Sequence, residues 1–298
     1  MASVSVFGPP PPPQPLAGTA RTRAARPETR IRARTARGVC QPAAVIPLKD
    51  NIPTRQFPIV TVTIIVICCV VYLLQGGLLS GPSNETVVKY SAIPYEITHP
   101  GKECGIAQTG EVVCQGQPGV SGTPPPQPST WLTILFAMFM HGSLFHIAGN
   151  MLFLWIFGNN VEDSMGRIRF PIFYLLGGLC ATGAQVLINP SSSTPTLGAS
   201  GAIAAVLGGY ALLYPHARVI TLIFIIIFVT VIELPALLVL GGWFLLQLAS
   251  AASQPLDTGG GVAYFAHIGG FIFGLLTIRL FANRARTDYE NLNRLPVY

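Results

Sequence analysis

The chain has 298 residues, of which 18 are basic and 12 acidic, and its composition is 10% charged and 50% apolar with a mean hydropathy of +0.53. A soluble domain is about a quarter charged and needs a polar surface that this composition cannot supply. Six cysteines are too few for a disulfide scaffold. We therefore expect an all-α, polytopic membrane protein.

The N-terminal segment is basic and poor in large apolar residues. Residues 1–49 are rich in Pro, Arg and Ala and contain one acid, Glu28. Such a segment cannot bury a core, so residues 1–52 are predicted to form a disordered basic tail. No apolar stretch typical of a cleaved secretory signal precedes residue 58. The composition also fits an organellar transit peptide, and this alternative to a cytoplasmic tail stays open.

Six apolar segments are predicted to cross a membrane, which takes roughly 20 residues of helix. In chain order they lie at 58–79, 143–157, 170–188, 200–214, 234–252 and 262–281. Together they predict a membrane domain over residues 53–283, followed by a cytoplasmic C-terminal tail over 284–298. The run 219–232 either lengthens the fifth helix or lies as an interfacial hairpin.

The apolar run 131–157 is too long for one straight span, because a helix of that length would reach about 40 Å. The sequence His141-Gly142-Ser143 is its natural break, with Ser143 as the N-cap of the second span. Residues 131–140 are then expected to form a separate apolar piece in the outer leaflet.

The fourth span is unusually short. Pro215 ends it, so residues 200–214 reach only about 22 Å. The loop 189–199 must therefore descend into the membrane to reach Ser200. Irregular backbone at that depth is tolerated only inside protein or beside a water-filled cavity, so we expect a cavity open to the outside.

The basic residues predict the orientation of the spans. With six spans, 16 of the 18 basic residues lie on the side of the two termini. We expect that side to be the cytoplasm of a bacterium, with an organellar inner membrane as the alternative. The polar loop 81–129 lies on the other side, where disulfides persist, and Cys104 and Cys114 in it are expected to pair. Basic residues that flank spans favour a lipid bilayer, not nucleic acid, as a partner.

Four polar side chains from three spans are predicted to lie at similar depth. Ser200 opens the fourth span and His267 lies five residues into the sixth, each about 8 Å below the outer surface. His146 and Asn150 share one face of the second span, at about 5 and 10 Å. Polar groups in hydrocarbon are costly, so each is a functional candidate.

This cluster fits nucleophilic catalysis. A serine hydroxyl needs a general base at neutral pH, and His267 can be that base for Ser200. The helix N-terminus at Ser200 favours a developing oxyanion, to which His146 and Asn150 can donate hydrogen bonds. No inward-facing Asp lies at this level, which predicts a dyad and not a triad.

Small residues at every fourth position predict close packing of the fourth and sixth spans. They are Gly201, Ala205 and Gly209 on the one and Ala266, Gly270 and Gly274 on the other. His141 and Glu162 are predicted to have structural roles.

In these motifs the sequence resembles the rhomboid family of intramembrane serine proteases, over about residues 53–283. The motifs are His141-x4-His146-x3-Asn150, Gly198-x-Ser200-Gly201 and Ala266-His267-x2-Gly270-x3-Gly274, in the family's order. The resemblance implies a rhomboid-like fold of six helices and an endopeptidase that cuts membrane-anchored substrates without metal or cofactor. It implies that Ser200 is the nucleophile, that His267 is the general base, and that His146, Asn150 and the Ser200 backbone N–H form the oxyanion hole. It also implies a substrate gate at Trp243 and Phe244.

Two departures from the family and three other interpretations accompany this resemblance. The first loop lacks the Trp-Arg dipeptide of many bacterial members, and Ala204 stands where an aromatic residue often positions the histidine ring. The main alternative is a catalytically inactive rhomboid-like protein that binds membrane partners as a chaperone. A transporter would show charged residues near the midplane or an internal repeat. Zinc bound by His141, His146 and His267 would lack an acidic or thiol ligand.

Overall fold

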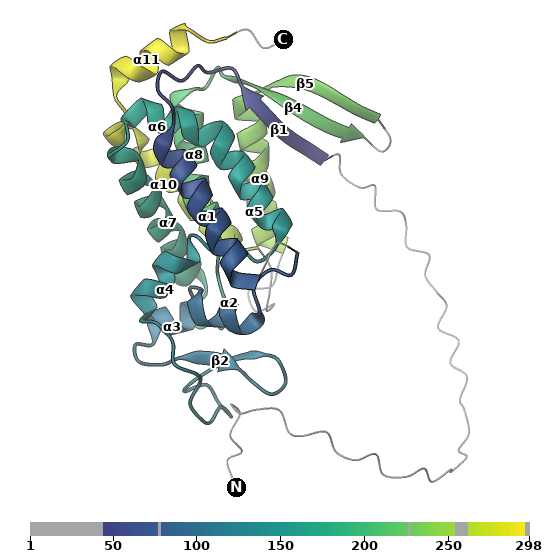
Figure 1. Cartoon of the computed structure of the whole chain (residues 1–298), viewed down its shortest axis with the longest axis vertical. Helices are drawn as coiled ribbons and strands as arrows, with labels where there is room; N and C mark the ends of the chain where they lie inside the picture. The colour runs from purple at the N-terminus through teal and green to yellow at the C-terminus, as the bar shows by residue number, and fades with distance from the viewer. Residues whose placement is uncertain (1–43, 77–78, 226–227, 254–261, 296–298) are drawn as a thin grey trace, which may run out of the picture.

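The computed structural model describes residues 44–76, 79–225, 228–253 and 262–295, so most of the predicted N-terminal tail lies outside the described residues. The described chain is mostly helical, and its helices form one bundle (Figure 1). One end of the bundle carries three strands and the C-terminal helix α11 (Arg284–Leu292). The other end carries α2 (Asn84–Tyr90), α3 (Pro94–Thr98) and strand β2 (Cys104–Ile106).

Four of the described helices are long and apolar enough to cross a membrane. They are α1 (Ile59–Gly76), α7 (Arg169–Ile188), α9 (Ala236–Ser253) and α10 (Tyr264–Phe281). Each lies within a few residues of a predicted span. The predicted total of six spanning helices is not confirmed, because the other two helical segments do not have the length of a span as single α-helices.

The second predicted span is a helix whose winding changes along its length. It consists of α5 (Leu144–Phe153), the π-helix η1 (Leu154–Gly158) and α6 (Asn159–Met165), which follow one another directly. The Ser143 side chain accepts a hydrogen bond from the His146 amide at 3.2 Å, which is the predicted N-cap. The apolar piece before the break is α4 (Thr130–Ala137).

Helix α8 (Ser200–Leu213) is the centre of the bundle, and every residue from Gly201 to Ala211 is buried. Its backbone touches that of α10. A Cβ atom at Gly270 would collide with the carbonyl oxygen of Gly201, and one at Gly274 would collide with that of Ala205. The small residues therefore allow the close approach that their spacing predicted.

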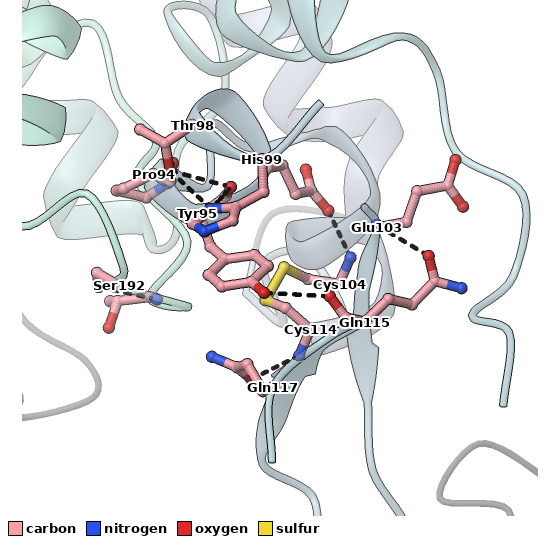
Figure 2. The surroundings of a disulfide bond; sticks show 12 residues. Pro94, Tyr95, Thr98, His99, Glu103, Cys104, Cys114, Gln115, Gln117 and Ser192 are labelled. Atoms are coloured by element: carbon pink, nitrogen blue, oxygen red, sulfur yellow. Dashed lines mark hydrogen bonds between the residues drawn. A yellow bond between two sulfur atoms is a disulfide. The ribbon is translucent and has the colours of Figure 1, made fainter. Parts of the chain in front are cut away.

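The segment 81–129, predicted to be a loop, contains ordered elements. In addition to α2 and α3 it holds an antiparallel hairpin of β2 and β3 (Val112–Cys114). Cys104 and Cys114 form a disulfide across this hairpin (Figure 2). The hairpin buries a small apolar cluster with Ile93 and Tyr95. The prediction of a loop missed these elements, because a composition rich in Pro and Gly is typical of loops. Here Pro94 begins α3, Gly105 lies in β2 and Gly110 lies in the turn between the two strands. We call residues 84–114 the cap.

The cap holds the loop that leads to Ser200. Ala92 and Thr196 exchange two backbone hydrogen bonds, of 3.0 and 2.8 Å. The Tyr95 amide donates to the carbonyl of Ser192 at 3.0 Å (Figure 2). The irregular backbone of residues 189–199 is thus braced by protein on the side of the cap.

Residues 44–50, predicted to belong to a disordered tail, form strand β1 (Ala44–Asp50). It pairs with β4 (Arg218–Ile225), which pairs in turn with β5 (Phe228–Pro235), all antiparallel. The segment 219–232 is therefore a hairpin and does not extend α9. The prediction for 44–50 was wrong because its partner strand lies far along the chain, where local composition carries no sign of it.

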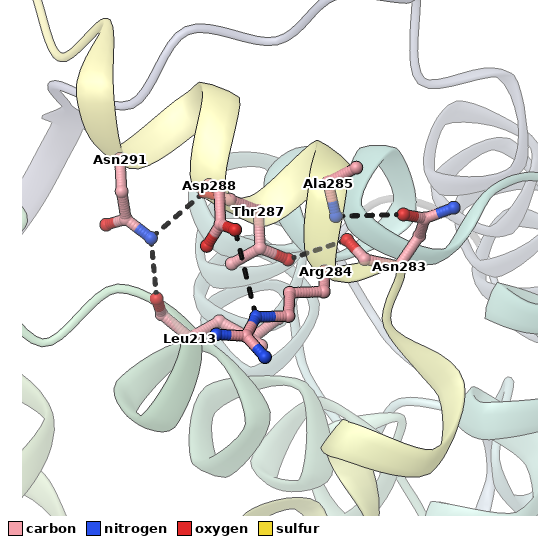
Figure 3. Close-up of polar contacts among 7 residues, drawn as sticks. All are labelled: Leu213, Asn283, Arg284, Ala285, Thr287, Asp288 and Asn291. Carbon is pink, nitrogen blue, oxygen red and sulfur yellow. Dashed lines mark hydrogen bonds and ion pairs between the residues drawn. The ribbon is translucent and has the colours of Figure 1, made fainter.

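The predicted C-terminal tail begins with a helix, α11. The Asn283 side chain caps it by accepting a hydrogen bond from the Ala285 amide at 3.0 Å. Asn291 donates to the carbonyl of Leu213 at 3.0 Å, and so fastens α11 to the end of α8 (Figure 3). The buried Glu290 accepts a further hydrogen bond from the hydroxyl of Tyr214. Helix α11 is thus part of the folded body.

Candidate active site

Ser200 is the first residue of α8, directly after a sharp turn. Gly198 in that turn has φ +127°, a conformation that residues with a side chain rarely adopt. Its amide donates to the carbonyl of Ala137 at 2.8 Å. A Cβ atom at Gly198 would lie only 2.8 Å from Nε2 of His146. Glycine at this position therefore lets the His146 ring approach Ser200.

Ser200 and His267 are joined by a hydrogen bond of 2.7 Å between Oγ and Nε2. On the other side of the ring, Nδ1 lies 2.8 Å from Oε1 of Gln247 on α9. The amide nitrogen of Gln247 donates to the carbonyl of Trp243 at 3.4 Å, which leaves Oε1 as an acceptor for His267. From these contacts we infer that Nδ1 carries the proton and that the lone pair of Nε2 faces the Ser200 hydroxyl.

Gln247 was missed in the sequence. A signal existed, because a polar side chain inside an apolar span is a functional candidate by default. Gln247 lies in the predicted span 234–252, but it belongs to no motif and is 20 residues from His267. Only the packing of α9 against α10 brings the two side chains together.

His146 and Asn150 line the same cavity as Ser200. The side-chain nitrogen of Asn150 is buried and has no hydrogen-bond partner in the described part of the chain. Nδ1 of His146 accepts a long hydrogen bond of 3.5 Å from the Gly142 amide, which leaves Nε2 as a donor beside Gly198. A buried donor without a partner is costly, so both groups can gain by donating to an oxygen bound in the cavity.

The cavity predicted from the short fourth span has a volume of about 720 Å³. Residues of α5, α7, α8 and α10 line it, together with the loop 189–199, including Ser192, Thr194 and Gly198. Ser200 and His267 both face this space. It is large enough for several residues of a peptide segment.

Two aromatic residues of α9 lie against α10 beside His267. The Trp243 ring is 5.7 Å from the His267 ring, and Phe244 stacks on Phe271 at 4.5 Å between ring centres. Ala204 is fully buried and brings no ring to the histidine. An aromatic neighbour of His267 therefore comes from α9 and not from α8.

Glu162 and His141 lie outside the hydrogen-bond chain of Ser200. Both carboxylate oxygens of Glu162 accept backbone amides at the start of α1, from Val60 at 3.0 Å and from Thr61 at 2.7 Å. An acid at a helix N-terminus is favourable, and this one fastens α6 to α1. His141 is buried with its ring 5.2 Å from that of His146. Both positions suit the structural roles predicted for them.

The fold and the site together define a polytopic membrane protein with a serine–histidine pair inside a cavity. The chain belongs to the rhomboid family, because the Rhomboid domain model matches residues 128–284, just over half of its length. Members of this family are generally intramembrane serine proteases, and some are inactive. The matched stretch contains Ser200, His267, His146 and Asn150.

Three curated relatives show the range of the similarity. Rhomboid protein 1, mitochondrial, of Saccharomyces cerevisiae is 31% identical over 49% of this chain and 40% of its own length. Presenilin-associated rhomboid-like protein, mitochondrial, of Bos taurus is 32% identical over 48% of this chain and 36% of its own. Rhomboid protease GluP of Bacillus subtilis is 39% identical over 28% of this chain and 16% of its own. The match thus spans less than half of each relative.

These relatives do not support the bacterial plasma membrane that we expected for this chain. Those with the longest matches given above are named as mitochondrial proteins. Of the two locations that we considered, the relatives favour the organellar membrane. The sequence could not separate the two, because a basic, acid-poor segment is typical both of a cytoplasmic flank and of an organellar transit peptide.

Proposed function

We propose that this chain is an intramembrane serine endopeptidase that hydrolyses peptide bonds in or near the transmembrane segments of membrane-anchored proteins. The observation that carries the proposal is the hydrogen bond of 2.7 Å between Ser200 and His267 at the wall of a large cavity. The proposed chemistry uses only groups of this chain and water, without metal or cofactor.

In the first half-reaction, Oγ of Ser200 attacks the carbonyl carbon of the substrate while Nε2 of His267 takes the hydroxyl proton. The tetrahedral intermediate collapses, His267 gives the proton to the leaving amine, and an ester to Ser200 remains. In the second half-reaction, His267 takes a proton from water, which attacks the ester carbonyl. When this second tetrahedral intermediate collapses, His267 returns the proton to Oγ of Ser200 and the new carboxyl end is released. Gln247 keeps the lone pair of Nε2 of His267 available, because its Oε1 accepts a hydrogen bond from the Nδ1–H group.

The negative oxygen of each tetrahedral intermediate would be bound by donors already in position. We assign this role to the Ser200 backbone N–H at the start of α8, to Nδ2 of Asn150 and to Nε2 of His146. The unpartnered state of the Asn150 nitrogen within the described chain supports the assignment.

Substrate would enter beside α9. The outward face of this helix carries exposed leucines that suit lipid, among them Leu238 and Leu245. On its inner side Trp243 lines the cavity, and both Trp243 and Phe244 pack on Phe271 of α10. Displacement of these two rings would admit a substrate segment from the bilayer.

The proposed topology has six spans in a membrane domain over residues 53–283. The continuous helix of α5, η1 and α6 has 10, 5 and 7 residues, which reach about 33 Å together. The buried α8, with 14 residues, reaches about 21 Å and would be surrounded by the other spans. We propose an organellar inner membrane as the location, because the two relatives with the longer matches are named as mitochondrial proteins.

Reconstitution of the purified chain with a generic single-span substrate tests this function. We expect cleavage, and labelling of Ser200 by a fluorophosphonate probe. Ser200→Ala and His267→Ala should each abolish cleavage while the protein stays folded in detergent. Binding of the substrate without cleavage or labelling by the wild type would favour the inactive, chaperone-like alternative.

A further inference from the structure

Helix α11 covers the end of the bundle where α8 ends at Leu213, the opposite end of α8 from Ser200. A second pocket lies beside α11. It forms where the turn between α6 and α7 meets the turn between α10 and α11, and its volume is about 410 Å³. Three arginines line it, Arg167, Arg169 and Arg286. Its described lining contains no Asp or Glu.

Two of these arginines are held in place by main-chain carbonyl groups. Arg169 donates from Nη1 to the carbonyl of Phe281 at 3.1 Å, and Arg286 donates from Nη1 to that of Asp163 at 3.0 Å. A guanidinium has five N–H donors, so most donors remain free for a ligand. Gly166 leaves room for the Arg286 head, since a Cβ atom there would lie 3.3 Å from Nη1.

The positive charge of the pocket is not neutralised by the described chain. Elsewhere Arg218 pairs with Glu233 and Arg284 with Asp288, but the three pocket arginines have no carboxylate partner among the described residues. Like charges in one pocket repel, and an anion that contacts all three relieves this repulsion. The planar guanidinium matches the geometry of phosphate oxygens.

Exposed apolar side chains adjoin the arginines on the bundle side. Ile168, between two of them in sequence, is 80% exposed, and Leu280 on the last turn of α10 is 79% exposed. The hydrogen bond from Arg169 to Phe281 places the Arg169 guanidinium where α7 begins and α10 ends, next in sequence to these apolar side chains. A free phosphate would use only the arginines, whereas a phospholipid would use both surfaces.

We propose that this pocket binds the phosphate of an anionic phospholipid, whose acyl chains lie along α7 and α10. Basic pockets at the membrane surface suit such headgroups. The site is separate from Ser200, and the proposal does not depend on the protease function.

Native mass spectrometry of the purified full chain in neutral detergent tests the proposal. The probes are dioleoyl phosphatidylglycerol, dioleoyl phosphatidylcholine and inorganic phosphate. We expect the wild type to retain phosphatidylglycerol in preference to phosphatidylcholine. Arg167→Gln should weaken that retention by about five-fold, and Arg167→Gln with Arg286→Gln by about 25-fold.

Arg284→Gln is the matched control, because Arg284 lies on α11 beside the pocket but pairs with Asp288. It should leave retention unchanged, and Arg167→Lys should keep most of it. If loss of the Arg286 contact unfolds the double variant, the single Arg167→Gln variant decides. Equal retention in Arg167→Gln and wild type, or equal retention of the two lipids, would overturn the proposal. Complete displacement of the lipid by millimolar phosphate would show a site for a soluble anion instead.

Discussion

Gln247, the hydrogen-bond partner of His267, is neutral, and this limits what Gln247 can contribute to the site. A carboxylate would stabilise the imidazolium as well as orient the ring, as in a serine protease triad. Oε1 of Gln247, at 2.8 Å from Nδ1, can orient the ring and select its tautomer without adding a charge. A charge would be costly at membrane depth. We therefore assign Gln247 as a positioning residue that acts through His267.

Gln247→Leu should lower kcat by roughly 10- to 100-fold, a part of what general-base catalysis supplies, with little change in KM. Gln247→Glu keeps an acceptor oxygen at the same place and should restore part of the rate, although its charge at membrane depth should lower stability. Gln75→Leu on α1 makes the same change at a residue that does not line the cavity, and it should have no effect. Steady-state cleavage kinetics in one detergent measure all three. If Gln247→Leu lowered stability but left kcat unchanged, the role of Gln247 would be structural instead.

The double variant Asn150→Ala with His146→Ala should slow cleavage by about 10²–10³-fold, because two donors to the oxyanion are removed. Each single variant should lose less, since the remaining donor partly replaces the other. The rate of substrate cleavage checks this prediction, with fluorophosphonate labelling in parallel as a measure of the reactivity of Ser200. An unchanged rate in the double variant would remove both residues from the oxyanion hole.

Among the elements, the cap connects the disulfide to the loop that precedes Ser200. Its helix α3 holds the loop 189–199 by a hydrogen bond from Thr98 Oγ1 to the carbonyl of Pro190 at 2.7 Å, and by the contact of Tyr95 with Ser192. The next turn of the cap is fixed by the disulfide and by buried Glu96, whose Oε1 accepts the Cys104 amide at 2.7 Å. The order of this hairpin therefore supports the loop that positions Ser200.

Replacement of both Cys104 and Cys114 by Ser should destabilise the cap by about 2–3 kcal/mol, the loop-closure entropy expected for a ring of this size. Protease sensitivity of the segment and the thermal midpoint in detergent measure the effect. Cleavage should be slowed but not abolished, because neither cysteine takes part in the chemistry. The control is Cys180→Ser, which removes an exposed thiol on α7. A midpoint equal to that of the control, with no added protease sensitivity, would show that the bridge does not brace the cap.

At the scale of the whole molecule, the two ends of the bundle are built differently. The cap covers the end near Ser200, whereas the sheet and α11 cover the other end (Figure 1). That other end contains buried carboxyl groups outside the spans. Burial raises the pKa of Asp50 to about 7 and that of Glu290 to about 8. In the folded protein, Tyr210 and Asn160 donate hydrogen bonds to Asp50 at 2.5 and 2.6 Å.

These raised pKa values predict that stability falls as pH rises. The unfolded chain loses the Asp50 proton near pH 4, while the folded chain keeps it until about pH 7. Asp50 therefore contributes most to the free energy of unfolding below about pH 4. This contribution is lost as the pH rises from about 4 to about 7. Asp50→Asn keeps an acceptor oxygen and should flatten the fall of the thermal midpoint over that window. Asp288→Asn, an exposed acid, should leave the slope as in wild type; a wild-type slope in Asp50→Asn would contradict the prediction.

Local patterns predicted the parts of this protein that depend on neighbours in sequence. The break at Ser143, the short helix from Ser200 and the small-residue rows follow from capping, from Pro215 and from spacing along one helix. The meeting of Ser200 with His267 was predicted from their depth, because helix rise converts sequence position into height in a membrane. For the same reason the cavity beside Ser200 could be expected.

Tertiary structure alone decided the contacts between segments that are distant in sequence. The strand from Ala44 to Asp50 pairs with residues near Val219, and Asn291 binds the end of α8, although composition near each segment is that of a tail. Gln247 reaches His267 only because α9 packs on α10 in one rotation. Helix periodicity is equally compatible with other rotations, since both faces of α9 are apolar. The packing of the whole bundle sets which side chains meet across helices. The sequence of any one helix does not contain this information.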